Sequence, residues 1–132
     1  MPQVRPKPDN PEVQRRNATA RRSSGTHEIF TTGALVLATF HSPKEKFIGA
    51  VLSLTAEGIS LCGLELGSLT DFTSRTRSGE AAQPAFLFFP MHRLERLELD
   101  AADGDIPSVQ QQFEERTGKK LSELFAGKRR RA

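Results

Sequence analysis

Short apolar runs separated by turn residues occupy the middle of the chain and predict a small β-rich fold. Residues 33–41 are rich in strand-forming side chains, residues 42–45 have turn chemistry, and residues 46–55 resume the strand pattern, so the three segments predict a hairpin. Gly49 stands in the middle of the second run and indicates a sharp bend or a bulge there. Residues 56–58 then form a tight turn into a third strand.

The third, fourth and fifth strands follow the hairpin. In residues 59–66, Ile59 and Leu61 fall on one face and Cys62 and Leu64 on the other, so neither face is uniformly polar. Residues 84–90 are apolar on both faces, which indicates either a covered barrel wall or a sheet edge used in assembly. Residues 93–100 predict a fifth strand. Between the third and fourth strands, residues 67–83 are polar and predict a loop containing one helical turn.

A helix is expected after the strands. Asp105 or Ser108 can cap its start, Ser108 with Gln111 fits a capping box, and Gly118 fits the left-handed position that ends a helix. A second short helix is expected in residues 119–127, where Leu121, Leu124 and Phe125 recur at helical spacing. The expected architecture is therefore mainly β with a C-terminal helix: a small, highly curved antiparallel barrel of about five strands in residues 29–105, followed by a helical segment in residues 106–127.

Charge is sorted along the chain of 132 residues. Residues 1–28 hold six basic and three acidic side chains, residues 29–118 hold seven and twelve, and residues 119–132 hold six and one. Residues 1–28, with four prolines and almost no large apolar side chain, predict a disordered basic arm, and residues 128–132 a basic tail. Eight basic residues in these ends are candidates for nucleic-acid contact: Arg15, Arg16, Arg21, Arg22, Lys128, Arg129, Arg130 and Arg131.

The strand pattern resembles that of the Sm-like family, which includes the bacterial host-factor RNA chaperones. Residues 33–40 and 46–61 are similar to the first half of such a barrel, and residues 86–99 to its second half with a very short connection between the last two strands. The resemblance implies an SH3/Sm-like barrel, subunits that pair through their fourth and fifth strands into a homo-oligomeric ring, and RNA bound near the loops. It also places Phe86, Phe88 and Phe89 at a subunit interface.

His92 and Arg93 are the candidate nucleic-acid site within the folded body, because imidazole can stack on a base and guanidinium can bind a phosphate with two hydrogen bonds. By the resemblance, they stand where the chaperones carry a Lys-His pair. The alternative interpretation is a surface turn in which Arg93 pairs with Glu95 or Asp100. For the basic ends the alternative is a solvated tail that keeps the protein soluble.

Catalytic interpretations find little support in the sequence. The three histidines and Cys62 lack close metal-ligand spacing, and Cys62 in an apolar strand is typical of a small buried residue. The acids Asp100, Asp103 and Asp105 do not fit an EF-hand loop. We therefore expect neither an enzyme nor a bound metal or cofactor.

No apolar run approaches the ~20 residues that a bilayer-spanning helix needs, so we expect no membrane partner. The single cysteine, Cys62, rules out an internal disulfide and predicts a cytoplasmic protein. The sequence predicts a non-catalytic binding module with RNA or another polyanion as ligand. A protein-interaction or assembly module that uses the phenylalanine-rich strand at residues 86–89 is the alternative. A cyclic-dinucleotide receptor of the PilZ type is a weaker alternative, prompted by arginines ahead of a barrel and by residues 58–63.

Overall fold

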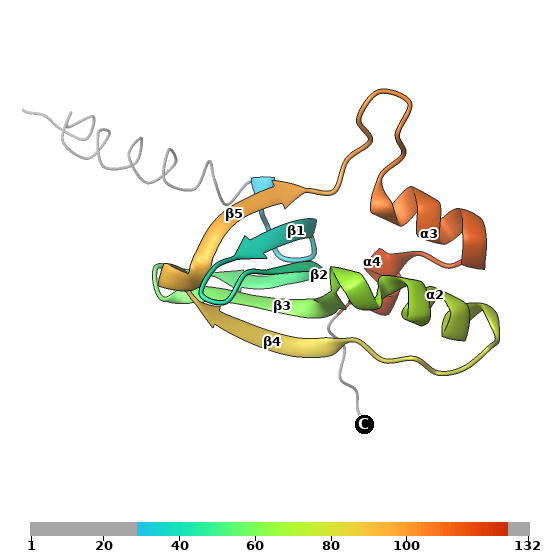
Figure 1. Cartoon of the computed structure of the whole chain (residues 1–132), viewed down its shortest axis with the longest axis horizontal. Coiled ribbons are helices and arrows are strands. Elements are labelled where there is room, and N and C mark those ends of the chain that lie inside the picture. Colours follow the sequence, from blue (N-terminus) through green and yellow to red (C-terminus); the bar gives the residue numbers. More distant parts are fainter. Residues whose placement is uncertain (1–28, 127–132) are drawn as a thin grey trace, which may run out of the picture.

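A computed structural model describes residues 29–126, and the part it describes is mainly β (Figure 1). Its five strands are β1 (Leu35–Phe40), β2 (Glu45–Leu54), β3 (Gly58–Glu65), β4 (Ala85–Pro90) and β5 (Leu94–Leu99). The predicted arm at residues 1–28 and the tail at residues 128–132 lie outside the described residues. The expected succession of five strands is confirmed.

The strands form one antiparallel sheet in the order β4-β3-β2-β1-β5. The sheet is open, with β4 and β5 at its two ends. A single 3₁₀ turn, Met91–Arg93, leads from one terminal strand to the other. Main-chain hydrogen bonds from Met91 N to Glu57 O and from His41 N to Arg93 O tie this turn to both sides of the sheet.

The sheet is curved enough to bring β1 and β4 together although they are not neighbours in the strand order. Phe40 of β1 stacks on Phe89 of β4 with ring centroids 3.9 Å apart. The ring of Phe47 contacts both, edge-on to Phe40 and tilted relative to Phe89. These rings belong to an inner apolar cluster whose buried members are Val36, Ala38, Phe40, Val51, Ile59, Leu61 and Phe89. The inner face of the curved sheet thus forms one half of the core.

Two features of β2 produce this curvature. Gly49 lies opposite Gly63 of β3, and a Cβ atom at position 63 would collide with the main-chain carbonyl of Ile48. The register between β2 and β3 shifts between Val51 and Ser53, so the bulge stands at Leu52. Of the two irregularities predicted for Gly49, a bend or a bulge, the bulge lies at Leu52 instead. Gly49 is needed because two strand backbones approach each other closely there.

Three helices pack on part of the outer face of the sheet: α2 (Leu69–Arg77), α3 (Val109–Thr117) and α4 (Leu121–Leu124) (Figure 1). The second half of the core lies beneath them, and its buried members are Ile48, Ala50, Cys62, Phe72, Phe113, Leu121 and Phe125. Strand residues of both faces are buried because the inner face packs on itself and the outer face packs on helices. This arrangement explains why β3 carries no uniformly polar face.

Helix α2 corrects the expectation of a loop between the third and fourth strands. Its sequence, LTDFTSRTR, has little helix propensity. It is held instead by Phe72, which is buried against Phe113, and by the hydroxyls of Thr73 and Thr76, which donate to the carbonyls of Leu69 and Phe72. The helix therefore depends on tertiary packing that its own sequence does not signal.

The caps predicted for α3 are confirmed. Ser108 Oγ accepts from Gln111 N at 3.1 Å, the Gln111 side chain accepts from Ser108 N at 2.7 Å, and Gly118 has the left-handed φ of 78°. The structure adds a contact that the sequence did not suggest. The carboxylate of Asp100, at the end of β5, accepts from Val109 N and Gln110 N, both at 2.8 Å.

Candidate interaction surface

Strand β4 presents two large apolar side chains to solvent. It pairs with β3 on one side, with Leu61 opposite Leu87 and Ser60 opposite Phe88, and it is the last strand at its end of the sheet (Figure 1). Leu87 and Phe89 point into the inner cluster. Successive side chains of a strand alternate between faces, so Phe86 and Phe88 share the opposite face, where they are 53% and 58% exposed.

Among the described residues, the part of the outer face that the helices bury does not include Phe86 and Phe88. The rings of Phe72, Phe113 and Phe125 pack together over β2 and β3, whereas neither Phe86 nor Phe88 belongs to either buried cluster. A Cβ atom at Gly58 would lie 2.6 Å from Cζ of Phe88, so the Phe88 ring lies over the main chain of that glycine. The two phenylalanines thus form an apolar surface on a terminal strand.

The two terminal strands differ in how they are protected. Strand β5 carries Glu95, Arg96 and Glu98, and charged side chains on an edge strand discourage pairing with another chain. Strand β4, with the sequence AFLFFP, carries no charge, and its only protective residue is Pro90 at its end. Of the two, β4 is therefore the edge suited to receiving another strand.

Among the residues expected at the interface, Phe86 and Phe88 lie on this surface and Phe89 does not. Phe89 is 8% exposed and stacks on Phe40 in the inner core. The alternation of a six-residue strand explains the division, because Phe89 is one position out of phase with the other two. The interaction surface is accordingly defined here as the outward side chains of Phe86 and Phe88 together with the outer edge of β4.

The guanidinium of Arg93 is engaged inside the fold. Its Nε donates to His41 O at 2.8 Å, and its Nη2 donates to Pro43 O at 2.9 Å and to Glu45 Oε1 at 2.8 Å. The carbon of the guanidinium also lies 5.7 Å from the Phe40 ring centroid and 5.6 Å from that of Phe89. Arg93 thus joins the turn after β4 to the hairpin between β1 and β2.

The expected partners of Arg93 are engaged elsewhere. Glu95 faces Lys44 at 3.8 Å, and Asp100 caps α3, so the ion pair of Arg93 forms with Glu45. His92 is exposed in the same turn. Of the two candidate nucleic-acid residues in the body, only His92 is exposed, while the side chain of Arg93 is 18% exposed. The candidate basic residues of the two ends, Arg15, Arg16, Arg21, Arg22, Lys128, Arg129, Arg130 and Arg131, lie outside the described residues.

Residues 29–126 contain no cluster of three or more histidine, cysteine, aspartate or glutamate side chains arranged to hold a metal ion. Within the same residues, no helix has the length and apolar character needed to cross a bilayer. Comparison of the chain with models of protein families, with curated proteins and with solved structures finds no match.

Proposed function

We propose that this chain is a non-catalytic assembly module that pairs with a second copy of itself along β4. The observation that carries the proposal is the pair of exposed phenylalanines on a terminal strand that bears no charge. Exposed strand edges are normally shielded, and a flat apolar edge favours the addition of another strand. A second strand laid along β4 would remove both rings from water.

The sequence of β4 suits antiparallel pairing with itself. A two-fold axis at Leu87 sets Phe86 opposite Phe88 of the second copy, and Phe88 opposite Phe86 of the second copy. Four phenylalanine rings then share one face of a continuous sheet, and cross-strand aromatic pairs stabilise such sheets. Pro84 and Pro90 flank the paired residues and limit the contact to a short segment.

Pairing of β4 with β5 of a second copy is the arrangement that an Sm-like ring would use. The strand order β4-β3-β2-β1-β5 and the one-turn connection between β4 and β5 support an SH3/Sm-like fold for this chain. The side chains favour the two-fold arrangement. On β5, the outer-face residues Arg96 and Glu98 would stand beside the phenylalanines, whereas a second β4 offers apolar rings.

The mass of the full chain in solution, measured by sedimentation equilibrium over a range of concentrations, tests the proposal. We expect a dimer whose dissociation constant rises at least tenfold in the Phe86→Ser, Phe88→Ser double variant, since removal of about 1.4 kcal/mol of contact free energy corresponds to tenfold. Leu99→Ser on β5 is the matched control, because Leu99 is 43% exposed on the opposite terminal strand. Far-UV circular dichroism checks that all variants fold.

Two outcomes would overturn the two-fold assembly. If the chain is a monomer at all concentrations, the proposed dimer does not form, and any strand that pairs with β4 belongs to a different protein. A larger ring that Leu99→Ser disrupts would assign the contact to β4 and β5 together.

RNA binding through the basic ends is a second candidate, favoured by the separation of charge along the chain. Residues 1–28 and 119–132 hold twelve basic and four acidic side chains, while residues 29–118 hold seven and twelve. Binding of this kind releases counterions and weakens steeply as salt is raised. We expect salt-dependent binding of a mixed RNA pool by the full chain and its loss when Arg15, Arg16, Arg21 and Arg22 are changed to Gln. If the four-arginine variant still binds RNA and His92→Ala does not, the RNA site lies in the folded body.

A further inference from the structure

A pocket of about 360 Å³ lies where the end of β2 runs beside the segment that leads into β1. Phe30 and Leu54 are partly buried there and pack against the inner apolar cluster, so the pocket opens at the margin of the inner core. All the residues that line it are uncharged: Phe30, Thr31, Thr32, Val51, Leu52, Ser53, Leu54 and Thr55.

On this side of β2, the neighbouring segment turns away before β2 ends. Val51 N donates to Ala34 O at 2.9 Å, and Val51 O accepts from Gly33 N at 2.7 Å. The chain ahead of these residues forms a tight turn, in which Ala34 N donates to Thr31 O at 2.9 Å and Gly33 has a left-handed φ of 93°. Strand β2 continues to Leu54, and no strand of residues 29–126 runs beside this last part on that side.

The main chain of Leu54 points toward this uncovered side. Thr55 and Gly58 exchange two main-chain hydrogen bonds, of 3.0 and 3.2 Å, at the turn between β2 and β3. In an antiparallel ladder, such pairs alternate with pairs whose main-chain groups point outward, so the adjacent pair of Leu54 with Ile59 is of the second kind. Within residues 29–126, neither the N–H nor the C=O of Leu54 makes a hydrogen bond. A main-chain donor and a main-chain acceptor therefore face the pocket.

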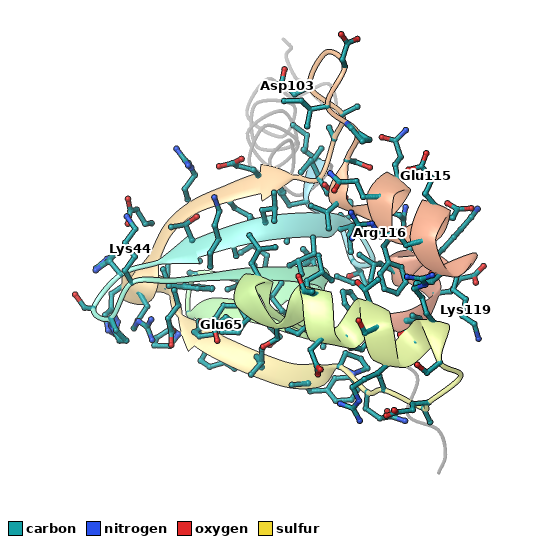
Figure 2. The ribbon with its side chains drawn as sticks, turned by 45° about the vertical axis from the view of Figure 1, so that its right-hand side comes forward. Lys44, Glu65, Asp103, Glu115, Arg116 and Lys119 are labelled. Carbon is teal, nitrogen blue, oxygen red and sulfur yellow. The ribbon has the colours of Figure 1, made fainter. Side chains whose placement is uncertain are left out.

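The lining of the pocket selects against a charged partner. The charged side chains labelled in Figure 2 belong to the hairpin between β1 and β2, to the end of β3, and to α3 with the segments on either side of it. None of them lines the pocket. A charged group that entered the pocket would lose hydration without gaining an opposite charge, so the partner that fits is uncharged.

A second copy of this chain does not meet this requirement. Within residues 29–126, its terminal strands are β4, which the two-fold contact uses, and β5, which carries Glu95, Arg96 and Glu98. An extended segment of another protein supplies the groups that Leu54 needs, because each of its residues other than proline carries one N–H and one C=O. Addition of such a segment to the edge of a sheet is a common mode of peptide recognition.

We propose that the pocket binds an uncharged, extended peptide segment of another protein, which adds a short strand beside the end of β2. One peptide residue accepts from Leu54 N and donates to Leu54 O, and its side chain falls on the inner face, where Leu54 and Phe30 pack. The turn at residues 31–34 limits the length of the added strand at one end. The proposal goes beyond the assembly function and is independent of it, because no residue of β4 lines the pocket.

Titration of the ¹⁵N-labelled full chain with the peptide acetyl-Thr-Val-Thr-Val-amide, followed by NMR, tests this site. We expect saturable shifts at the Leu54 amide, and its hydrogen exchange should slow by at least tenfold in the complex because the amide gains an acceptor. The Val51 amide, which donates to Ala34 O, is the internal control and should exchange slowly with and without the peptide. The Phe86→Ser, Phe88→Ser double variant should bind the peptide as the wild type does.

A peptide of the same sequence methylated at every amide nitrogen is the matched probe, since it keeps the side chains and cannot donate. It should bind at least tenfold more weakly, because Leu54 O then loses its donor. Leu54→Pro, which removes the N–H of Leu54, should weaken binding of the unmethylated peptide by about tenfold. Leu54→Ala keeps this N–H and should cost less than about threefold. Far-UV circular dichroism checks the fold of both variants, and the methylated peptide decides the question if Leu54→Pro does not fold.

Four outcomes would overturn the site. The first is the absence of saturable shifts at Leu54, and the second is equal binding of the methylated peptide, which would exclude main-chain pairing. Slow exchange of the Leu54 amide without peptide would show that this edge is already covered. Weaker binding by the Phe86→Ser, Phe88→Ser variant would place the peptide on β4.

Discussion

Arg93 donates a hydrogen bond to Glu45 at 2.8 Å across 48 residues of sequence, and this pair joins the turn between the two terminal strands to the hairpin of β1 and β2. The same guanidinium donates to two main-chain carbonyls of the hairpin and lies near the rings of Phe40 and Phe89. Arg93 therefore holds together the end of the sheet at which its curvature brings β1 and β4 into contact.

Replacement of Arg93 by Met should destabilise the fold by about 2–4 kcal/mol, because it removes three hydrogen bonds from a side chain that is 18% exposed. The free energy of unfolding in urea measures this effect. Arg96→Met is the control, and it should change the free energy by less than about 0.5 kcal/mol, since its ion pair with Glu98 is largely in water. Equal effects of the two variants would show that the contacts of Arg93 contribute no more than a surface ion pair.

The close approach of Gly49 and Gly63 gives a second prediction. Gly63→Ala should cost about 2–4 kcal/mol, because its Cβ would collide with the Ile48 carbonyl and with Gly49 Cα and so force β2 and β3 apart. Gly67→Ala provides the comparison, since no atom of residues 29–126 lies within 4 Å of the position of its Cβ. Thermal unfolding of the two variants measures the difference, and similar melting temperatures would contradict a close approach of the strands.

The local part of this architecture follows from the sequence. The five strands, the capping box of Ser108 with Gln111 and the left-handed Gly118 depend on residues within a few positions of one another, and their patterns predicted them. The exposure of β4 was foreseen only as one of two alternatives. A strand apolar on both faces can be covered or can form an edge, and the choice depends on where the helices pack.

The contacts that escaped prediction join residues far apart in the chain. Arg93 was expected to bond to an acid within seven residues, but its partner Glu45 is brought near by the pairing of β1 with β5. Only one helical turn was expected where α2 stands, because its polar sequence is held by Phe72 against Phe113, a residue 41 positions later. The position of Thr39 between Lys46 and Arg96 likewise depends on the register of three strands, which no local pattern reveals.

Asp100 connects the end of β5 to the start of α3, and this connection is also testable. Asp100→Ala should destabilise the protein by about 1–3 kcal/mol, because the variant leaves the main-chain amides of Val109 and Gln110 without their charged acceptor at a helix N-terminus. Hydrogen exchange of these two amides should accelerate in the variant. Asp103→Ala, on the exposed loop before the helix, should leave both amides and the stability unchanged within about 0.5 kcal/mol.

The hydroxyl of Thr39 gives a prediction of the opposite sign. Thr39→Val replaces a buried hydroxyl that has no hydrogen-bond partner within residues 29–126 by a methyl group of similar size. The substitution should therefore stabilise the protein by about 1 kcal/mol, because the cost of burying the polar group disappears. Urea unfolding measures the gain. Thr73→Val is the control, since the Thr73 hydroxyl donates to Leu69 O at 2.7 Å, and we expect no stabilisation there. A loss of stability in Thr39→Val would mean that the hydroxyl already has a partner in solution.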